Sequence, residues 1–115
     1  MSTTSVGQAA EAVAAAYLQS KGYKLKDRNW RTRWCEIDLI AAKAGRLYFI
    51  EVKYRRRPDH GHGLAYITPA KLRRMTFAAE LWLSHYGYEG EWELAGLEVS
   101  GEAELKVSAW LPNLT

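Results

Sequence analysis

The sequence predicts a single α/β (α+β) domain with a central mixed sheet flanked by helices, in the order α-β-β-β-α-β-β. Three observations predict this class. The chain has 115 residues, the length of one ordinary domain. Two stretches repeat apolar residues at helical spacing, and five shorter stretches are rich in β-branched or aromatic residues. The composition, 48% hydrophobic and 25% charged, suits one modest core.

The N-terminal region predicts a helix followed by an edge strand. Ser5 and Gln8 form a capping-box pattern before a helix expected over residues 6–21. Residues 23–28 alternate apolar and basic side chains, which indicates a strand at a sheet edge. The apolar side of the helix is expected to be Ala10, Val13, Ala14, Tyr17 and Leu18.

Residues 35–42 and 46–53 are expected to pair as a β-hairpin, because both are rich in Ile, Leu, Val, Tyr and Phe. A two-residue turn at Ala44 and Gly45 would place Asp38 opposite Glu51. The same register would place Glu36 opposite Lys53, with opposed Cβ atoms about 4.5–5.5 Å apart. A loop longer by one residue would break this parity.

The second half predicts a helix and two further strands. Residues 55–63 form a basic, glycine-containing loop. Thr68 and Pro69 mark the start of a helix that Gly87 ends. Strands are expected over residues 91–99 and 104–111. The buried side of the helix is expected to be Leu72, Met75, Ala79, Trp82 and Tyr86.

Charge is unevenly distributed along the chain. Residues 21–74 hold fifteen of the sixteen Lys and Arg residues but only five of the thirteen acids, a net charge of +10. The remainder carries −7, which leaves +3 for the chain. A one-sided positive field suits a polyanion-binding surface. Charge runs alone most often only solvate a surface, so this observation favours nucleic acid without establishing it.

Cysteine usage and the N-terminal segment indicate a cytoplasmic protein. Cys35 is the only cysteine, so no internal disulfide can form and a reducing compartment is the simpler interpretation. The N-terminus lacks the basic and apolar regions of a signal peptide. No stretch approaches the roughly 18 apolar residues of a membrane span, and no membrane partner is expected.

The predicted hairpin carries the unusual chemistry. Two carboxylates, Asp38 and Glu51, would meet on one face and repel each other unless a cation lay between them. Mg²⁺, or Mn²⁺, takes one or two carboxylates together with water and phosphate oxygens, and can promote phosphodiester hydrolysis. Lys53 could orient the attacking water or neutralise developing charge. Glu11, at the border of the apolar stripe of the first helix, could supply a further ligand. The structural alternative is a cross-strand salt bridge between Glu36 and Lys53.

Several basic residues are candidates for nucleic-acid binding. Arg55, Arg56 and Arg57 follow the hairpin directly and could grip phosphates, although they could equally form a solvated turn. Lys71 and Arg74 lie near a helix N-terminus, where the dipole disfavours cations, which indicates a nearby anion or carboxylate. Other residues weighed for binding are Trp30 and Trp34, which could stack on bases or pack, and Asp59, His60 and His62, which are interpreted as polar loop residues rather than a zinc site.

These residues resemble two known patterns. Asp38 followed by Glu51-Val52-Lys53 resembles the PD-(D/E)xK nuclease signature. The segments 28–31 (RNWR), 36–40 (EIDLI) and 49–53 (FIEVK) together resemble the YraN-like family of small bacterial proteins, and the resemblance covers nearly the whole chain. Two departures are Cys35, where family members usually carry Gly, and Trp92-Glu93-Leu94, where they tend to carry an Arg-Phe-Asp-type strand.

The resemblance implies a restriction-endonuclease-like fold related to archaeal Holliday-junction resolvases. It implies that Asp38 and Glu51 bind metal, that Lys53 is the catalytic lysine, and that Glu11 is the helix acid. The candidate nucleic-acid-binding residues are Arg28, Arg31, Arg55, Arg56, Arg57, Lys71 and Arg74.

Three functions remain open from the sequence. The leading hypothesis is a Mg²⁺- or Mn²⁺-dependent endonuclease acting on structured or branched DNA, with DNA favoured over RNA. The alternative is a non-catalytic module on a nuclease fold that binds nucleic acid or a DNA-processing partner. A third is an interaction protein whose C-terminal strand pairs edge to edge in a homodimer.

Overall fold

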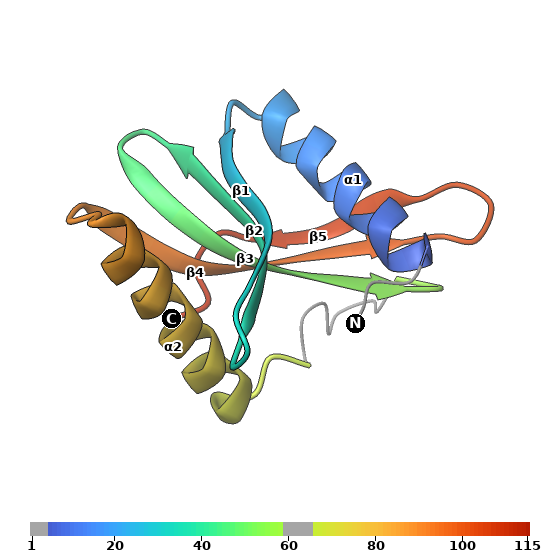
Figure 1. Ribbon diagram of the computed structural model, residues 1–115. Helices are drawn as coiled ribbons and strands as arrows, with labels where there is room; N and C mark the ends of the chain where they lie inside the picture. The colour runs from blue at the N-terminus through green and yellow to red at the C-terminus, as the bar shows by residue number, and fades with distance from the viewer. Residues whose placement is uncertain (1–4, 59–65) are drawn as a thin grey trace.

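One twisted five-stranded sheet organises the chain, with strand order β1-β2-β3-β4-β5 (Figure 1). The computed structural model describes residues 5–58 and 66–115. The predicted α/β (α+β) class and order of elements are confirmed, with boundaries that differ from the predicted ones by at most three residues. The elements are α1 (Ser5–Ser20), β1 (Lys24–Arg31), β2 (Glu36–Lys43), β3 (Arg46–Arg55), α2 (Pro69–Tyr86), β4 (Glu91–Ser100) and β5 (Lys106–Leu111).

The sheet is mixed because one connection crosses over. β1, β2 and β3 pair antiparallel in sequence order. The segment containing α2 then returns the chain so that β4 pairs parallel with β3, and β5 pairs antiparallel with β4. β1 is an edge strand, as predicted. β5 is the other edge, so it has one open side, and the homodimer expected through it stays a prediction.

The two helices cover opposite faces of the sheet, each over its own apolar core (Figure 1). α1 buries Ala10, Ala14 and Leu18 against one face, as its predicted stripe requires. On the other face Trp82 of α2 packs edge-on against Phe49 of β3, with ring centroids 5.7 Å apart. Tyr86 was expected in this core but is 53% exposed, and its ring packs on Trp82 and His85 of its own helix instead: that prediction is wrong.

The predicted hairpin turn is confirmed. Ala44 and Gly45 both have positive φ, 53° and 78°, the combination of a type I′ turn. Lys43 pairs with Arg46, and the register continues to Leu39 opposite Ile50. The turn therefore sets which faces of β2 and β3 their side chains share.

The start of α2 is held as its sequence predicts. The Thr68 hydroxyl accepts a hydrogen bond from the Lys71 amide at 3.1 Å, and Pro69 is the first helical residue. Gly87 ends the helix in the left-handed region at φ 68°. These caps fix the first turn of α2 and with it the place of Lys71 and Arg74.

Neither helix in the described ranges, residues 5–58 and 66–115, carries an apolar run long enough to cross a membrane. The cytoplasmic location inferred from the cysteine and the N-terminus stays a prediction.

Candidate active site

The site lies where β2 and β3 separate. Pairing between these strands ends at Leu39 and Ile50. Beyond that point β2 stays paired with β1 as far as Glu36, whereas β3 stays paired with β4 as far as Arg55. The two strands of the hairpin therefore follow different neighbours and leave a gap between them (Figure 1).

Asp38 lies at the point of separation and bonds to the opposite backbone. Its Oδ2 accepts a hydrogen bond from the Val52 amide at 2.8 Å. The Asp38 side chain therefore takes the place of a main-chain carbonyl in the hydrogen bonding between β2 and β3. Glu51 precedes that amide. The predicted opposition of Glu36 and Lys53 is wrong, because the strands have separated before they reach it, and no ion pair joins these two described residues.

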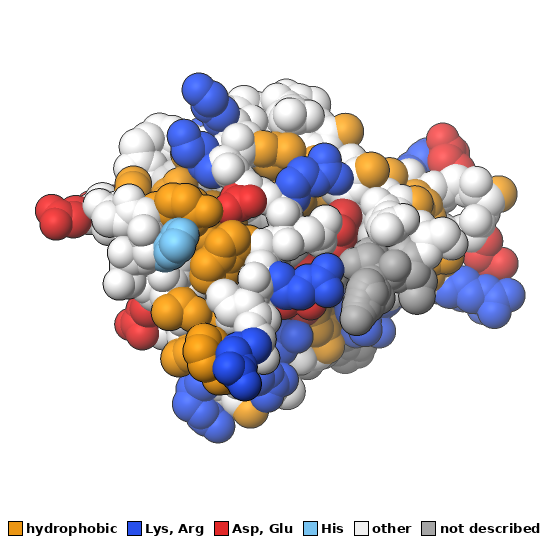
Figure 2. Space-filling model, in the orientation of Figure 1, with side chains coloured by type: hydrophobic (Ala, Val, Ile, Leu, Met, Phe, Trp, Pro, Cys, Tyr) orange, Lys and Arg blue, Asp and Glu red, His pale blue; other side chains and the backbone are white. Residues whose placement is uncertain are grey.

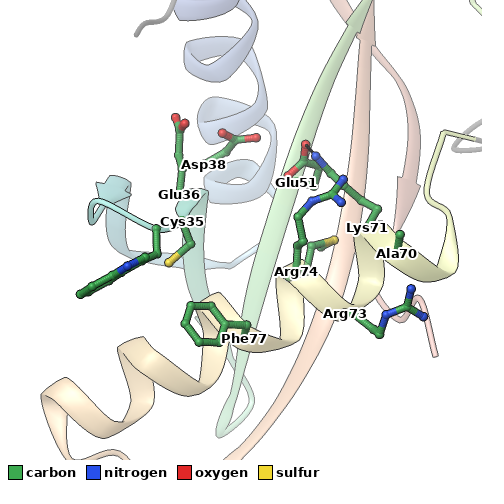
Figure 3. Close-up of a pocket in the computed structure, with 11 residues that line it drawn as sticks. Cys35, Glu36, Asp38, Glu51, Ala70, Lys71, Arg73, Arg74 and Phe77 are labelled. Carbon is green, nitrogen blue, oxygen red and sulfur yellow. Dashed lines mark ion pairs between the residues drawn. The ribbon is translucent and has the colours of Figure 1, made fainter.

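A pocket of about 500 Å³ fills the gap between the separated strands and the first half of α2. Asp38 and Glu51 both line it. They lie beyond the last cross-strand pair, so their predicted direct opposition is wrong, and it is the shared pocket that brings the two carboxylates together. Figure 3 shows Glu51 beside Lys71 and Arg74 of α2, with Asp38 and Glu36 on the other strand.

The surroundings of Asp38 disfavour its charged form. Burial is the largest cause, and the neighbouring Glu51 charge is the next; together they raise the pKa of Asp38 to about 7. The hydrogen bond from Val52 opposes this rise, whereas Glu11 and Glu36 add to it. The effects that disfavour a negative charge on Asp38 therefore outweigh the hydrogen bond that favours it.

Glu11 joins the site from the other helix. It is only 7% exposed in α1, and burial is the main reason that its pKa is raised. A hydrogen bond from the Asn29 side chain lowers this pKa, as do the nearby charges of Arg28 and Arg31. Glu11 is thus placed within electrostatic reach of the carboxylates, but it does not line the pocket.

Lys71, rather than Lys53, is the amine at the carboxylates. Lys71 Nζ lies 2.9 Å from Glu51 Oε2, so the carboxylate expected near the start of this helix is found. Lys53 is exposed and does not line the pocket. Its Nζ instead lies 5.7 Å from the centre of the Tyr66 ring.

Tyr66 was not found by sequence reasoning. Its hydroxyl is buried and has no hydrogen-bond partner among the described residues. Burial raises its pKa, and the charges of Glu51 and Asp38 add to the rise, which places the residue close to the site. It follows a loop without periodic pattern, and no local signal in the sequence distinguishes it from an ordinary loop tyrosine.

The candidate basic residues divide into two groups. Arg74 lines the pocket, and so does Arg73, which was not among the predicted residues. Figure 2 shows basic side chains gathered over the start of α2. Arg56 pairs at the surface with Glu102 at 3.3 Å, and Arg57 is exposed; neither lines the pocket.

Arg55 lies in a different environment from its neighbours. Its Nε is 2.9 Å from Glu98 Oε2, and Glu98, on β4, is 1% exposed. The Ser108 hydroxyl of β5 donates to the other carboxylate oxygen of Glu98 at 2.6 Å. This buried contact ties three strands together. Sequence reasoning missed this contact, because Glu98 stands between Leu97 and Val99 as a solvent-facing residue of a half-buried strand would.

The donor set fits a hard cation that keeps water or phosphate ligands. Among residues 5–58 and 66–115, no group of three or more His, Cys, Asp or Glu side chains could hold a metal ion. Asp38 and Glu51 supply two carboxylates, of which Glu51 is paired with Lys71, so Mg²⁺ or Mn²⁺ would fit here only with further oxygen ligands from solvent or substrate. Asp59, His60 and His62 lie outside the described residues.

Comparison with known proteins places this arrangement in one family. The model of the uncharacterised protein family UPF0102 matches residues 10–101. A UPF0102 protein of Chlorobium chlorochromatii is 39% identical, over 95% of this chain and 86% of its own length. One from Pseudomonas putida is 38% identical, over 97% and 93%. The matched segment contains α2 and every strand except β5, and the YraN-like resemblance agrees with it. The chain therefore belongs to the UPF0102 family.

Proposed function

We propose that this protein binds nucleic acid and acts as a divalent-metal-dependent endonuclease that hydrolyses phosphodiesters of structured or branched DNA. One observation carries the proposal: Asp38 and Glu51, from strands that separate at this point, line one pocket whose other wall carries Lys71 and Arg74. The order of elements and the Asp38…Glu51-Val52-Lys53 pattern support a place in the PD-(D/E)xK superfamily with a restriction-endonuclease-like fold.

The residues of the pocket have distinct parts in this proposal. Asp38 and Glu51 would hold the metal, and a divalent cation bound there would supply activation of a water molecule and polarisation of a phosphoryl oxygen. Arg74, on the opposite wall, holds the phosphate by charge. Lys71 neutralises Glu51, and a metal held by this carboxylate would free the amine to contact a phosphate. Lys53 remains the proposed catalytic lysine by its position in the pattern, and Glu11 adds negative charge from α1.

Cleavage of labelled DNA tests the proposal directly. Wild-type protein with Mg²⁺ or Mn²⁺ is expected to cut a four-way junction or flap in preference to a plain duplex. Asp38→Asn keeps the hydrogen bond to Val52 and is expected to lower the rate by about two orders of magnitude or more. Glu89→Gln, in an exposed loop beyond α2, is the matched control and should leave the rate unchanged. Equal cleavage by wild type and Asp38→Asn would show that the activity is contamination.

The positions of Lys71 and Lys53 favour a second function. Lys71 already pairs with Glu51, and Lys53 lies outside the pocket, an arrangement that would also suit a binding module without catalysis. Such a module would bind DNA in a salt-dependent manner, would bind equally after Asp38→Asn, and would cut nothing with any metal.

A further inference from the structure

An exposed tryptophan stands on the rim of the candidate active site. Trp34 is 70% exposed and lines the pocket that contains Asp38 and Glu51. Phe77 of α2 is 50% exposed and lines the same pocket. Large aromatic side chains that face solvent at a site are unusual, because their burial would otherwise stabilise the fold.

The backbone beneath Trp34 is held in place. The Thr32 hydroxyl accepts hydrogen bonds from the Trp34 amide at 3.0 Å and from the Cys35 amide at 3.2 Å. The Thr32 amide also donates to the Cys35 carbonyl at 2.9 Å. The indole is therefore presented to solvent from a fixed turn, so little conformational entropy is lost when a flat group stacks on it.

Trp34 also belongs to a second hollow. This hollow, of about 460 Å³, lies on the side of Trp34 that includes Trp30, Arg31 and His85. The Trp30 and His85 rings are 6.5 Å apart at its wall. Since Trp34 lines both cavities, the acidic pocket and the aromatic hollow adjoin at this side chain.

Cations accompany this aromatic surface. Arg33 lies over the Trp34 ring with its Cζ 5.4 Å from the centroid, and Arg31 lines the hollow. Arg73 and Arg74 of α2 line the pocket on the side of Phe77. Aromatic faces interleaved with arginine are the pattern by which proteins hold single-stranded nucleic acid, with bases stacked and phosphates held by charge.

We propose that Trp34 and Phe77 form a stacking subsite for an unpaired base, and that the single strand carrying this base runs across Trp34 into the hollow beside Trp30. The inference rests on the proposed function and names its substrate class: DNA with an unpaired strand next to the scissile phosphate, rather than continuous duplex. The phosphates follow Arg73 and Arg74, away from the Glu36 carboxylate on the other wall.

Binding without metal tests the subsite separately from catalysis. Fluorescence anisotropy in EDTA would compare a splayed fork with a blunt duplex of the same length. Wild type is expected to bind the fork about tenfold more tightly, within the range that stacking of one base produces. Trp34→Ala should reduce that preference to within about twofold and leave duplex binding unchanged, and Trp34→Phe should restore most of it.

Tyr86→Ala is the matched control. Tyr86 is an exposed aromatic residue of α2, the helix that carries Phe77, and it lines neither cavity. It should bind as wild type does. A thermal melt should show that Trp34→Ala folds normally, since the side chain is mostly exposed. Equal binding of fork and duplex by wild type, or an unchanged preference in folded Trp34→Ala, would overturn the subsite. Fork binding that depends on Trp34 without cleavage under any metal would instead overturn the nuclease and leave the subsite standing.

Discussion

The ionisation of Asp38 connects the stability of this protein to pH at a single residue. Its pKa is raised from 3.8 to about 7, so the folded chain holds the proton more tightly than the unfolded chain. Stability therefore falls as pH rises through this window, and the full cost remains above pH 7. Asp38→Asn removes the cost and keeps the acceptor for Val52. We expect it to raise the melting temperature at pH 8 by about 4 °C or more, and to change it little near pH 4.

Circular dichroism melts of wild type and Asp38→Asn at several pH values measure this difference. Glu89→Gln should show no such pH-dependent gain. A difference between wild type and Asp38→Asn that is constant from pH 4 to pH 8 would contradict the raised pKa of Asp38.

At the proposed metal site Lys71 would compete with a divalent cation for Glu51, because its amine lies 2.9 Å from the same carboxylate. Lys71→Gln removes that competitor and leaves the backbone hydrogen bond that caps α2. We expect Mn²⁺ to bind this variant several-fold more tightly than wild type, as measured by calorimetry. Lys106→Gln, an exposed cation of β5 that does not line the pocket, should not tighten binding. Weaker Mn²⁺ binding by Lys71→Gln would show that the lysine supports the metal instead.

At the level of elements, the hairpin turn contains a correctable strain. Ala44 has φ 53°, a left-handed conformation that costs an alanine roughly 1 kcal/mol and that asparagine tolerates. Ala44→Asn creates the Asn-Gly pair preferred in type I′ turns. We expect it to raise the free energy of unfolding by up to about 1 kcal/mol in urea titrations. Gly45→Ala, at φ 78°, should lower it.

The contact between β3, β4 and β5 is expected to depend on Arg55. Arg55→Ala would remove the guanidinium that lies 2.9 Å from Glu98, a carboxyl group that is 1% exposed, and would leave Ser108 as its hydrogen-bond partner among the described residues. Loss of one partner from a buried pair destabilises by about 3–5 kcal/mol. Arg56→Ala breaks only the exposed pair with Glu102 and should cost less than about 1 kcal/mol. Similar denaturation midpoints for the two variants would contradict a structural role for Arg55.

The elements were predictable because each is specified locally. Thr68 and Pro69 start α2, Gly87 ends it, and the alternation of β2 and β3 fixes their faces. The separation of those strands beyond Leu39 was not predictable, since it depends on which neighbouring strand each prefers. Because of that separation neither Asp38 and Glu51 nor Glu36 and Lys53 are directly opposed, although Asp38 and Glu51 still line one pocket.

At the scale of the whole molecule, the basic residues that are concentrated between residues 21 and 74 of the sequence lie in different environments. Arg73 and Arg74 line the pocket, whereas Arg55 is paired with a buried acid that lies far from it in sequence. Such long-range partners cannot be read from charge counts along the chain. The place of Tyr66 beside the carboxylates was hidden for the same reason, because it is set by tertiary packing.

Salt dependence of DNA binding should identify the cations that contact phosphate. Each such contact contributes about 0.9 to the slope of log affinity against log salt for duplex DNA. Arg73→Gln and Arg74→Gln are each expected to reduce the slope by about 0.9 in anisotropy titrations from about 50 to about 200 mM salt. Lys106→Gln, the one cation beyond residue 74, should leave it unchanged. An identical slope for all three variants would place the DNA on another surface.

The hydrogen bond from the Val52 amide gives Asp38 a structural role that is independent of the chemistry proposed for it. A relative without hydrolytic activity would still need a hydrogen-bond acceptor of the same length at this position, because this bond links β2 to β3. Retention of Asp or Asn at this position in a relative is therefore no proof of nuclease activity. Retention of Glu51 where Lys71 has been replaced is a stricter sign, because the ion pair with Lys71 then no longer accounts for the carboxylate.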